Sequence, residues 1–257
     1  MRSIALLGMI GLLPLSSIGL AGAGEARLYL APYVYPSNLS GEAQVTDSVT
    51  GTMFDLEDTL GMDPHETVIG VDGFVKFLGS RINFGYSQSE HSGDTRLEET
   101  VTFNDQTFTV GDRVRSDLEL KRYKLMYGFD FGLKVVNVGI LVGAQGVDAS
   151  ARLRSEVSGL RETEEFRGAI PVLGVTLGIH PVSKIAIHAE ASGLSLTISG
   201  VKVKLIDAFA GVDWYFVPKI GLKAGYRYFL LDAEDDDESD GLELDQNGPF
   251  VGLAVHL

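Results

Sequence analysis

The sequence predicts an all-β fold, a closed antiparallel up-and-down transmembrane β-barrel of ten strands. Three observations support this prediction. Apolar and polar residues alternate along segments of about ten residues, as in outer-membrane strands. Short turns lie at one end of these segments, and long polar segments lie at the other. After residue 24, no apolar stretch is long enough for a membrane-spanning helix, and inside lipid only helices and closed barrels satisfy every backbone hydrogen bond.

The clearest alternation lies in residues 121–148, which we predict to form two strands joined by a tight turn near residue 133. One face of the first strand is apolar or aromatic and carries Tyr123, Leu125, Tyr127, Phe129 and Phe131. The other face is polar or small and carries Arg122, Lys124, Met126, Gly128 and Asp130. The second strand repeats this pattern from Val136 to Gln145. Apolar residues facing lipid and polar residues facing a lumen are typical of outer-membrane strands.

The other predicted strands follow the same alternation, and their turns give the strand number. They cover 27–35, 67–78, the segment from 81, 169–179, 184–198, 201–217, 220–231 and 248–257. The short turns fall near residues 79, 133, 182 and 218, all at one end of the strands. Four such turns, with both termini on the same side, imply ten strands. Eight is the main alternative, because Pro32 weakens the first strand, and twelve follows if segment 36–66 also spans.

Longer polar segments should form loops at the opposite end. They cover 36–66, 91–117, 152–167 and 232–245. The first contains FDLEDTLGMD at 54–63, which is either a single helical turn or an irregular acidic loop. The second contains a hairpin signal around Asn104-Asp105.

Aromatic residues concentrate near the short-turn end, where an interfacial girdle of a membrane barrel is expected. These residues are Phe77, Tyr127, Phe129, Phe131, Trp214 and Phe216.

The N-terminus has the pattern of a secretory signal peptide. Arg2 precedes an apolar run from Ile4 to Leu15, and small residues follow at Ala21-Gly22-Ala23. We expect cleavage after Ala23, which divides the chain into a signal peptide at 1–23 and an outer-membrane barrel domain at 24–257. The alternative is a retained N-terminal anchor.

Composition excludes several classes of partner and chemistry. The net charge is −14, and removal of residues 1–23 takes away only one charge, that of Arg2. Nucleic acid is therefore not expected as a partner. The chain has no cysteine, which excludes disulfides, thiolate metal sites and cysteine nucleophiles.

The inward faces of the predicted strands carry equal numbers of positive and negative side chains. The candidate lumen-lining charges are Asp72, Lys76, Arg122, Lys124, Asp130, Glu190, Asp207, Asp213, Lys223 and Arg227. A ten-stranded barrel leaves only a narrow interior, and buried charges are stable only when they are paired or hydrated. We therefore expect ion pairs with water between them, and little or no conductance at rest.

Three segments resemble small Gram-negative outer-membrane β-barrel proteins, broadly the OmpW-like and porin-like group. They are FDLEDTLGMD at 54–63, AGYRYF at 224–229 and GPFVGLAVHL at 248–257. The resemblance implies an outer-membrane location, contact with lipid and lipopolysaccharide, and assembly by periplasmic chaperones and the barrel-assembly machinery. Members of this group commonly end in an aromatic residue, whereas this chain ends in Leu257.

Enzymatic interpretations have weaker support, and we predict no enzymatic activity and no cofactor. His188, Glu190 and Ser192 share one strand face, like a hydrolase set, but the polar face of any barrel strand would look the same. An omptin-like protease, also ten-stranded, would use His91 and acids near 235 in the loops. An EF-hand match that starts at Asp236 fails, because Asn247 stands where glutamate is required.

Two functional classes are compatible with these sequence features. The first and preferred one is a narrow or gated passage for small solutes. The second is a structural or adhesive barrel whose acidic loops bind lipopolysaccharide, cations or a partner.

Overall fold

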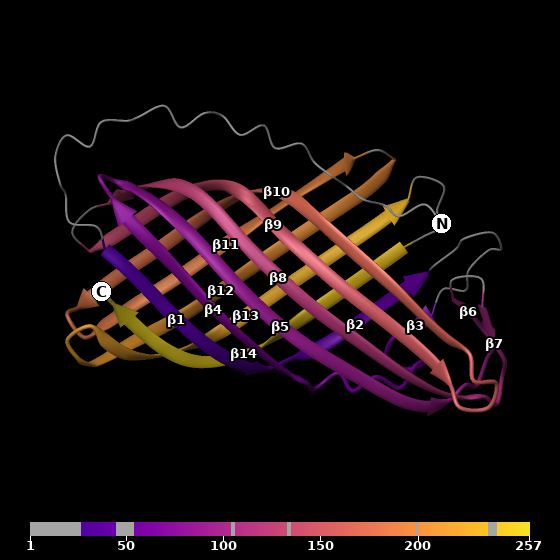
Figure 1. Ribbon diagram of the computed structural model, residues 1–257. Helices are drawn as coiled ribbons and strands as arrows, with labels where there is room; N and C mark the ends of the chain where they lie inside the picture. Colours follow the sequence, from indigo (N-terminus) through magenta and orange to yellow (C-terminus); the bar gives the residue numbers. More distant parts are fainter. Residues whose placement is uncertain (1–26, 45–53, 104–105, 133–134, 199, 236–240) are drawn as a thin grey trace.

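The computed structural model describes residues 27–44, 54–103, 106–132, 135–198, 200–235 and 241–257 (Figure 1). The predicted signal peptide, Asn104-Asp105 and the first residues of the rejected calcium loop lie outside this range. In the described part of the chain, no helix is long and apolar enough to cross a membrane.

Ten antiparallel strands form a closed barrel, as the sequence predicts. They are β1 (Arg27–Pro36), β4 (Thr67–Phe77), β5 (Ser80–Arg96), β8 (Arg113–Gly132), β9 (Val136–Ser155), β10 (Arg161–Val182), β11 (Ile185–Ile198), β12 (Val201–Val217), β13 (Ile220–Asp235) and β14 (Gly241–His256). Each strand pairs with the next one along the chain, and β1 pairs with β14, for example Tyr33 with Gly252. This last pairing closes the sheet, and Figure 1 shows the strands tilted strongly against the barrel axis.

Four shorter strands lie at the loop end of the barrel, which is the end opposite the short turns. β2 (Asn38–Gln44) continues β1 after Ser37 and pairs with β14, and β3 (Phe54–Asp55) pairs with β2. β6 (Val101–Phe103) and β7 (Gln106–Phe108) form a separate hairpin, with Phe103 opposite Gln106. The hairpin signal around Asn104-Asp105 therefore predicts this element correctly.

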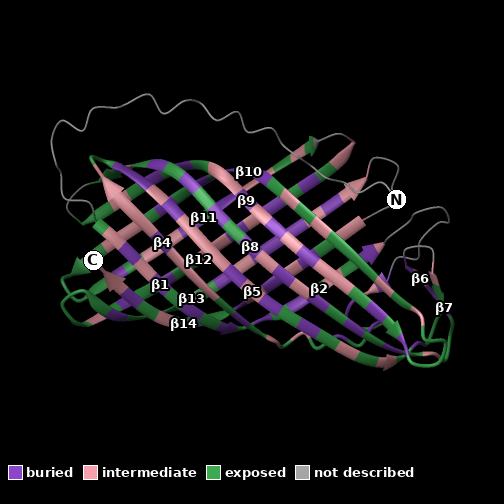
Figure 2. Cartoon of the chain, viewed as in Figure 1, coloured by how far each residue is buried: buried purple, intermediate pink, exposed green. Residues whose placement is uncertain are grey.

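Burial alternates along the barrel strands with a period of two residues (Figure 2). The predicted lipid face of β8 is exposed at Tyr123, Leu125, Tyr127, Phe129 and Phe131, whereas Arg122, Lys124 and Met126 are buried inside. The other strands follow, with outward-facing residues such as Ile140, Val175, Val212 and Val251. Of the expected girdle aromatics, Trp214 and Phe216 are also exposed, and Phe77 is partly buried at the mouth of the barrel.

A tight turn shows why the strands reverse so sharply at the turn end, defined as the end with the short connections. Phe77 pairs with Ser80, so only Leu78 and Gly79 form the connection. Both have positive φ, 48° and 80° respectively. Two consecutive residues of positive φ match the right-handed twist of adjacent strands, and glycine adopts this conformation without a steric penalty.

The long polar segments are more ordered than the sequence predicts, and the expectation of four extended loops is wrong. The segments 36–66, 91–117, 152–167 and 232–245 each contribute residues to strands. The charged segment 152–167, for example, leaves only residues 156–160 between β9 and β10. The physical reason is that alternation continues beyond the membrane with reversed polarity. Leu118 and Leu153 point inward there, while Arg115 and Arg154 are exposed.

Segment 54–63 closes the loop end of the barrel. Its acidic residues Glu57 and Asp58 are exposed, whereas Leu56, Leu60 and Met62 are buried. One hydrogen bond has helical spacing, from Thr59 N to Asp55 O at 3.2 Å, but the segment, described throughout, forms no helix. It is thus an acidic turn that is anchored by its leucines.

We predict that a charge on the lipid face will destabilise the barrel. Replacing Ile140, which is 59% exposed on the outer surface of β9, by arginine should lower the free energy of unfolding by about 2–4 kcal/mol, because an arginine at the bilayer midplane loses its hydration. Urea unfolding of the protein in lipid vesicles would measure this. The control is Val110→Arg, in a turn beyond the membrane where the side chain is 61% exposed. Equal losses in both variants would show that the lipid face is wrongly placed.

Candidate functional site in the barrel lumen

The lumen contains three successive regions. A cavity of about 500 Å³ lies at the turn end, and we call it the turn-end cavity. Next comes a layer of buried ion pairs, the ion network, formed by Asp72, Lys124, Glu190, Asp207 and Arg227. The loop-end half is filled by apolar side chains, which we call the apolar core.

The ion network joins strands from opposite sides of the barrel. Lys124 on β8 lies 2.6 Å from Glu190 on β11 and 3.5 Å from Asp207 on β12. Arg227 on β13 lies 2.9 Å from Asp72 on β4 and 3.4 Å from Asp207. None of these five side chains is more than 13% exposed. Two cations and three carboxylates therefore compensate one another across the full width of the lumen.

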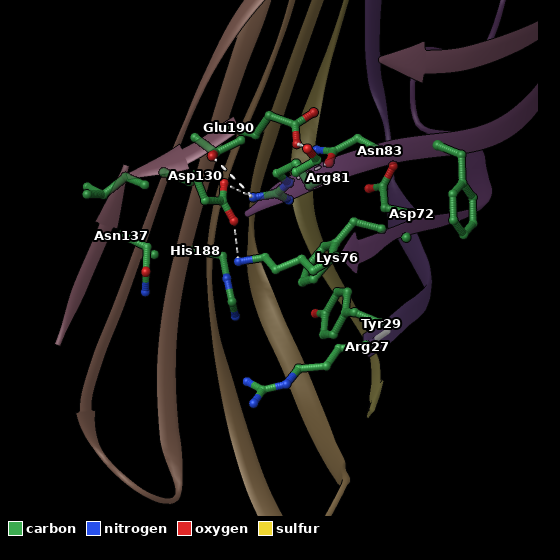
Figure 3. Close-up of a pocket in the computed structure, with 18 of the residues that line it drawn as sticks. Arg27, Tyr29, Asp72, Lys76, Arg81, Asn83, Asp130, Asn137, His188 and Glu190 are labelled. Atoms are coloured by element: carbon green, nitrogen blue, oxygen red, sulfur yellow. Dashed lines mark hydrogen bonds and ion pairs between the residues drawn. The ribbon is translucent and has the colours of Figure 1, made fainter. Parts of the chain in front are cut away.

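A second group of polar residues connects the ion network to the turn-end cavity. Lys76 lies 2.5 Å from Asp130, and Arg81 lies 3.3 Å from the same carboxylate. Arg81 also donates to Asn83, which in turn donates to Glu190 at 2.6 Å. Figure 3 shows this chain of contacts from Lys76 through Asp130 and Arg81 to Asn83 and Glu190. The polar groups thus hold one another in fixed positions.

Three of the candidate charges have no partner of opposite charge among the other nine. Arg122 donates to the hydroxyls of Ser87 and Tyr35, at 3.0 and 3.1 Å, and lies over the Phe229 ring. Lys223 lies over aromatic rings. Asp213 accepts from the hydroxyls of Tyr29 and Tyr215, and His188 lies 3.0 Å from it. The expected ladder of simple ion pairs is therefore incomplete. At these three positions, hydroxyl groups or aromatic rings contact the charged side chain where an oppositely charged candidate was expected.

The apolar core blocks the loop-end half of the lumen. Its members come from inward positions of β8, β9, β10, β12, β13 and β14, and from β2, β3, β6, β7 and the neighbouring segments that cover the end. They include Leu56, Leu60, Phe103, Phe108, Leu118, Leu120, Leu153, Leu205, Phe229, Leu231 and Leu244. A second, smaller space of about 20 Å³ lies beside the ion network, where Lys124, Asp207 and Arg227 line it. This is room for about one water molecule.

The turn-end cavity opens where the short turns lie. Leu78 and Gly79 of the first turn line its mouth, and Lys124 and Glu190 of the ion network form its inner end. Figure 3 shows Arg27, Tyr29, Lys76 and His188 around this space. Among the described residues, the cavity therefore extends from the short turns to the ion network.

The structure places all ten candidate charges on inward positions, but sequence reasoning missed several of their partners. Tyr29, Tyr35 and Gln246 are buried members of the polar interior. The period-two pattern of β1 does give the inward direction of both tyrosines, but nothing in the sequence indicates which distant residue each contacts. Gln246 lies between the expected loop at 232–245 and the expected strand at 248–257, so the sequence assigned it to no strand face.

The hydrolase set does not form a catalytic arrangement within the described residues. Glu190 is engaged by Lys124 and Asn83, and Ser192 accepts from Gln145 Nε2 at 2.8 Å. His91, expected in a loop, is 1% exposed on β5 beneath the covering segment, close to Asp63 O and Gln246. In the described part of the chain, no group of three or more His, Asp or Glu residues could hold a metal ion.

Comparisons with known proteins show similarity of the fold, without a detectable similarity of sequence to any family. No protein-family model matches the sequence, and no curated protein does. Among solved structures, the outer membrane protease OmpT from Escherichia coli is similar with a TM-score of 0.58 and 9% identity, over 94% of this chain and 100% of that one. Ail, the attachment invasion locus protein of Yersinia pestis, gives 0.43 and 10%, over 91% and 100%. The translocator domain of the autotransporter NalP from Neisseria meningitidis gives 0.44 and 12%, over 92% and 90%.

The chain therefore has the fold of the outer-membrane β-barrel proteins. The resemblance to small barrels of this class, first drawn from three sequence segments, is confirmed at the level of the fold.

We predict that breaking the ion network will cost much more than breaking an exposed ion pair. Lys124→Met leaves Glu190 and Asp207 buried without this cation, so the free energy of unfolding should fall by about 3–5 kcal/mol. The matched control is Lys121→Met on the same strand, whose partner Glu119 lies 2.5 Å away at a partly exposed site, and whose loss should cost at most about 1 kcal/mol.

The double variant Lys124→Met/Glu190→Gln provides a further check. Its free energy of unfolding should fall by less than the sum of the losses in Lys124→Met and Glu190→Gln, because the double variant removes both members of the pair at once. Urea unfolding in vesicles measures this free energy for the unmodified protein, for the two single variants and for the double variant. Additive costs would contradict a coupled network.

Proposed function

We propose that this protein is an integral outer-membrane barrel that forms no open pore at rest and acts by binding at its outer surface. The observation that carries this proposal is the closed lumen, in which the ion network and the apolar core follow one another between the turn end and the loop end. Barrels of this class place their short turns in the periplasm and their long connections outside. The apolar core then lies toward the outer side.

The outward surface of the projecting strands offers a site for binding. Arg115 on β8, Arg154 on β9 and Arg161 on β10 lie directly opposite one another in the strand register. Neighbouring Arg152 is also exposed. Of these, Arg115 has ion pairs with Asp94 and Glu156, whereas Arg152, Arg154 and Arg161 have none within the described residues. We call these four residues the arginine row.

Like charges directly opposite one another destabilise a sheet, so an anion that binds the arginine row would also stabilise the strands. The arginine row lies on the same outward face as the lipid-facing residues of β9, beyond them toward the loop end. This position corresponds to the level of the lipopolysaccharide sugars and phosphates above the membrane. We therefore propose that the arginine row binds the phosphate groups of lipopolysaccharide. It replaces the acidic loops, which the sequence suggested as the binding site.

Two carboxylates next to the arginine row, outside the membrane-spanning segments, form ion pairs with neighbouring arginines. Arg113 donates to both carboxylate oxygens of Asp94, at 2.7 and 2.9 Å. These hydrogen bonds lower the pKa of Asp94, so its carboxylate stays charged at neutral pH. Asp94 and Glu156 thus compensate Arg113 and Arg115 and leave the remaining arginines available.

We predict that the purified protein will show no stable conductance in a planar lipid bilayer. Neither the ion network nor the apolar core leaves a continuous aqueous path, and a bilayer recording at high salt would detect such a path directly. A general porin, reconstituted in the same lipid, serves as the positive control. Stable, ion-selective current steps in the unmodified protein would contradict the closed-lumen proposal.

We predict that the variant Arg152→Gln/Arg154→Gln will bind lipopolysaccharide at least about tenfold more weakly, since each cation near an anionic membrane surface contributes roughly 1 kcal/mol. The control is Lys202→Gln/Lys204→Gln, which removes the same charge from exposed positions of β12. Titration with fluorescent lipopolysaccharide in detergent measures both, and binding should weaken with salt. Equal losses in the two variants would indicate general electrostatic attraction and would contradict a specific site.

A gated passage is the second candidate, and the turn-end cavity favours it. The cavity reaches from the mouth to the ion network, so opening requires displacement of the ion network and the apolar core only. Transport of a solute into vesicles without steady conductance would support this candidate over the first.

The same contacts support a role without enzymatic activity. The fold similarity to OmpT, at 9% identity, does not extend to a reactive centre in our proposal. The inward hydroxyl of Ser192 and the carboxylate of Glu190 already have partners. Assays for peptide and ester hydrolysis test this directly.

A further inference from the structure

The turn-end cavity has the size and the charge of a ligand site. Its volume of about 500 Å³ lies in the range of small-molecule pockets. Among the described residues that line it, five side chains are cationic and three are carboxylates. The cations are Arg27, Lys76, Arg81, Lys124 and Lys223, and the carboxylates are Asp72, Asp130 and Glu190. The cavity is therefore locally positive within a chain of net charge −14.

All three carboxylates of the lining are already engaged. Asp130 is held by Lys76 and Arg81, Glu190 by Lys124, and Asp72 by Arg227. In the described part of the chain, Arg27 and Lys223 are the lining cations without a carboxylate within 4.0 Å. Arg27 is exposed at the mouth, so water can hydrate it. Lys223 is the one that requires an explanation.

Lys223 is a buried cation surrounded by aromatic rings. It is 4% exposed, and its ammonium nitrogen lies 4.6 Å from the ring centre of Phe209, 5.5 Å from that of Tyr29 and 5.7 Å from that of Phe250. The Phe250 ring fits there because Gly211 and Gly225 face it. A Cβ atom would lie only 3.0 and 2.8 Å from that ring at these two positions. The aromatic enclosure of Lys223 is therefore built into the strand sequences.

The carboxylate opposite Lys223 lies beyond ion-pair distance. Asp213 lies directly opposite Lys223 in the register of β12 and β13. Its Oδ2 accepts from Tyr29 at 2.8 Å and from Tyr215 at 3.1 Å, and it lies 3.0 Å from His188 Nε2. Two hydroxyls and an imidazole therefore contact Oδ2 of Asp213, whereas its Oδ1 has no hydrogen-bond partner among the described residues. Lys223 has no ion pair within 4.0 Å with any described residue.

A buried cation without a direct ion pair is costly, and cation–π contacts offset only part of that cost. An anion in the cavity would offset the rest. Because Lys223 is the one buried cation of the described lining without an ion pair, and Asp72, Asp130 and Glu190 also line the cavity, a singly charged ligand fits better than a dianion. The aromatic lining, in which Tyr29 stacks on Phe74 at 4.9 Å, favours a flat apolar body.

We infer that the turn-end cavity binds a small aromatic monocarboxylate, whose carboxylate contacts the Lys223 ammonium and whose ring lies against Tyr29, Phe74 and Phe209. The ligand enters at the turn end, on the periplasmic side in barrels of this class. This site is distinct from the arginine row, and it does not depend on whether the barrel conducts.

Calorimetric titration of the folded full-length protein in detergent tests the inference, with benzoate as the probe. Benzoate should bind saturably, and its uncharged analogue benzamide should bind at least tenfold more weakly, because it lacks the charge that Lys223 requires. This comparison uses the unmodified protein, so it remains valid if a variant fails to fold. No saturable binding of benzoate, or equal affinity for benzamide, would overturn the inference.

Two further measurements locate the site. Lys223→Met should weaken benzoate binding at least tenfold, whereas Lys121→Met, on the outer face of β8, should leave it unchanged. Slower migration of boiled than of unheated protein on a detergent gel confirms that each variant is folded. In crystals soaked with 4-bromobenzoate, the anomalous bromine signal should lie in the turn-end cavity. A signal only at another place, or equal effects of the two substitutions, would overturn the inference.

Discussion

The pairing of β1 with β14 is the constraint on which the rest of the structure depends. Inside lipid, an unpaired strand edge would leave a row of backbone groups without hydrogen bonds. Pro32 on β1 weakens the closing pair, because proline has no N–H group to donate. The two strands nevertheless pair on both sides of this residue, at Leu30 with Val255 and at Tyr33 with Gly252. Beyond Ser37, β2 continues along β14, so the last strand is covered over its full length.

Closure also creates the two environments that explain the side-chain pattern. Between the lipid-facing surfaces, strands place apolar residues outward and polar residues inward, so the ion network is separated from lipid by the strand wall. Beyond the membrane the same strands have the polarity of a soluble barrel, as Leu120 and Leu153 point inward and Arg154 points to solvent. One continuous set of strands therefore carries a charged interior at one level and an apolar interior at the next.

This division has direct consequences for function. A polar lumen by itself would hold water and admit ions, whereas an apolar core above it would oppose a continuous aqueous path, as we propose. Two accessible surfaces carry our proposals, namely the outer arginine row and the turn-end cavity. They lie at opposite ends of the barrel and differ in chemistry, because the first consists of solvated guanidinium groups and the second encloses a buried ammonium group in aromatic rings.

The sequence by itself determined the class of fold, the strand number and the direction of each strand face. These are local properties, because alternation with a period of two and short turns can be read from neighbouring residues. It also determined which charges point inward, such as Lys124 and Asp207. Only the tertiary structure decided their partners, since Lys124 and Glu190 are 66 residues apart in the chain and meet through barrel closure. The same holds for Asp213, which lies opposite Lys223 but accepts a hydrogen bond from Tyr29, a residue 184 positions away in the chain. Apart from the β6–β7 hairpin, the strand extensions and short strands at the loop end were not predicted, because charged residues were taken to indicate loops. Beyond lipid, a charged side chain on the outer face of a strand is simply solvated, and the buried leucines between such charges hold the strand in place.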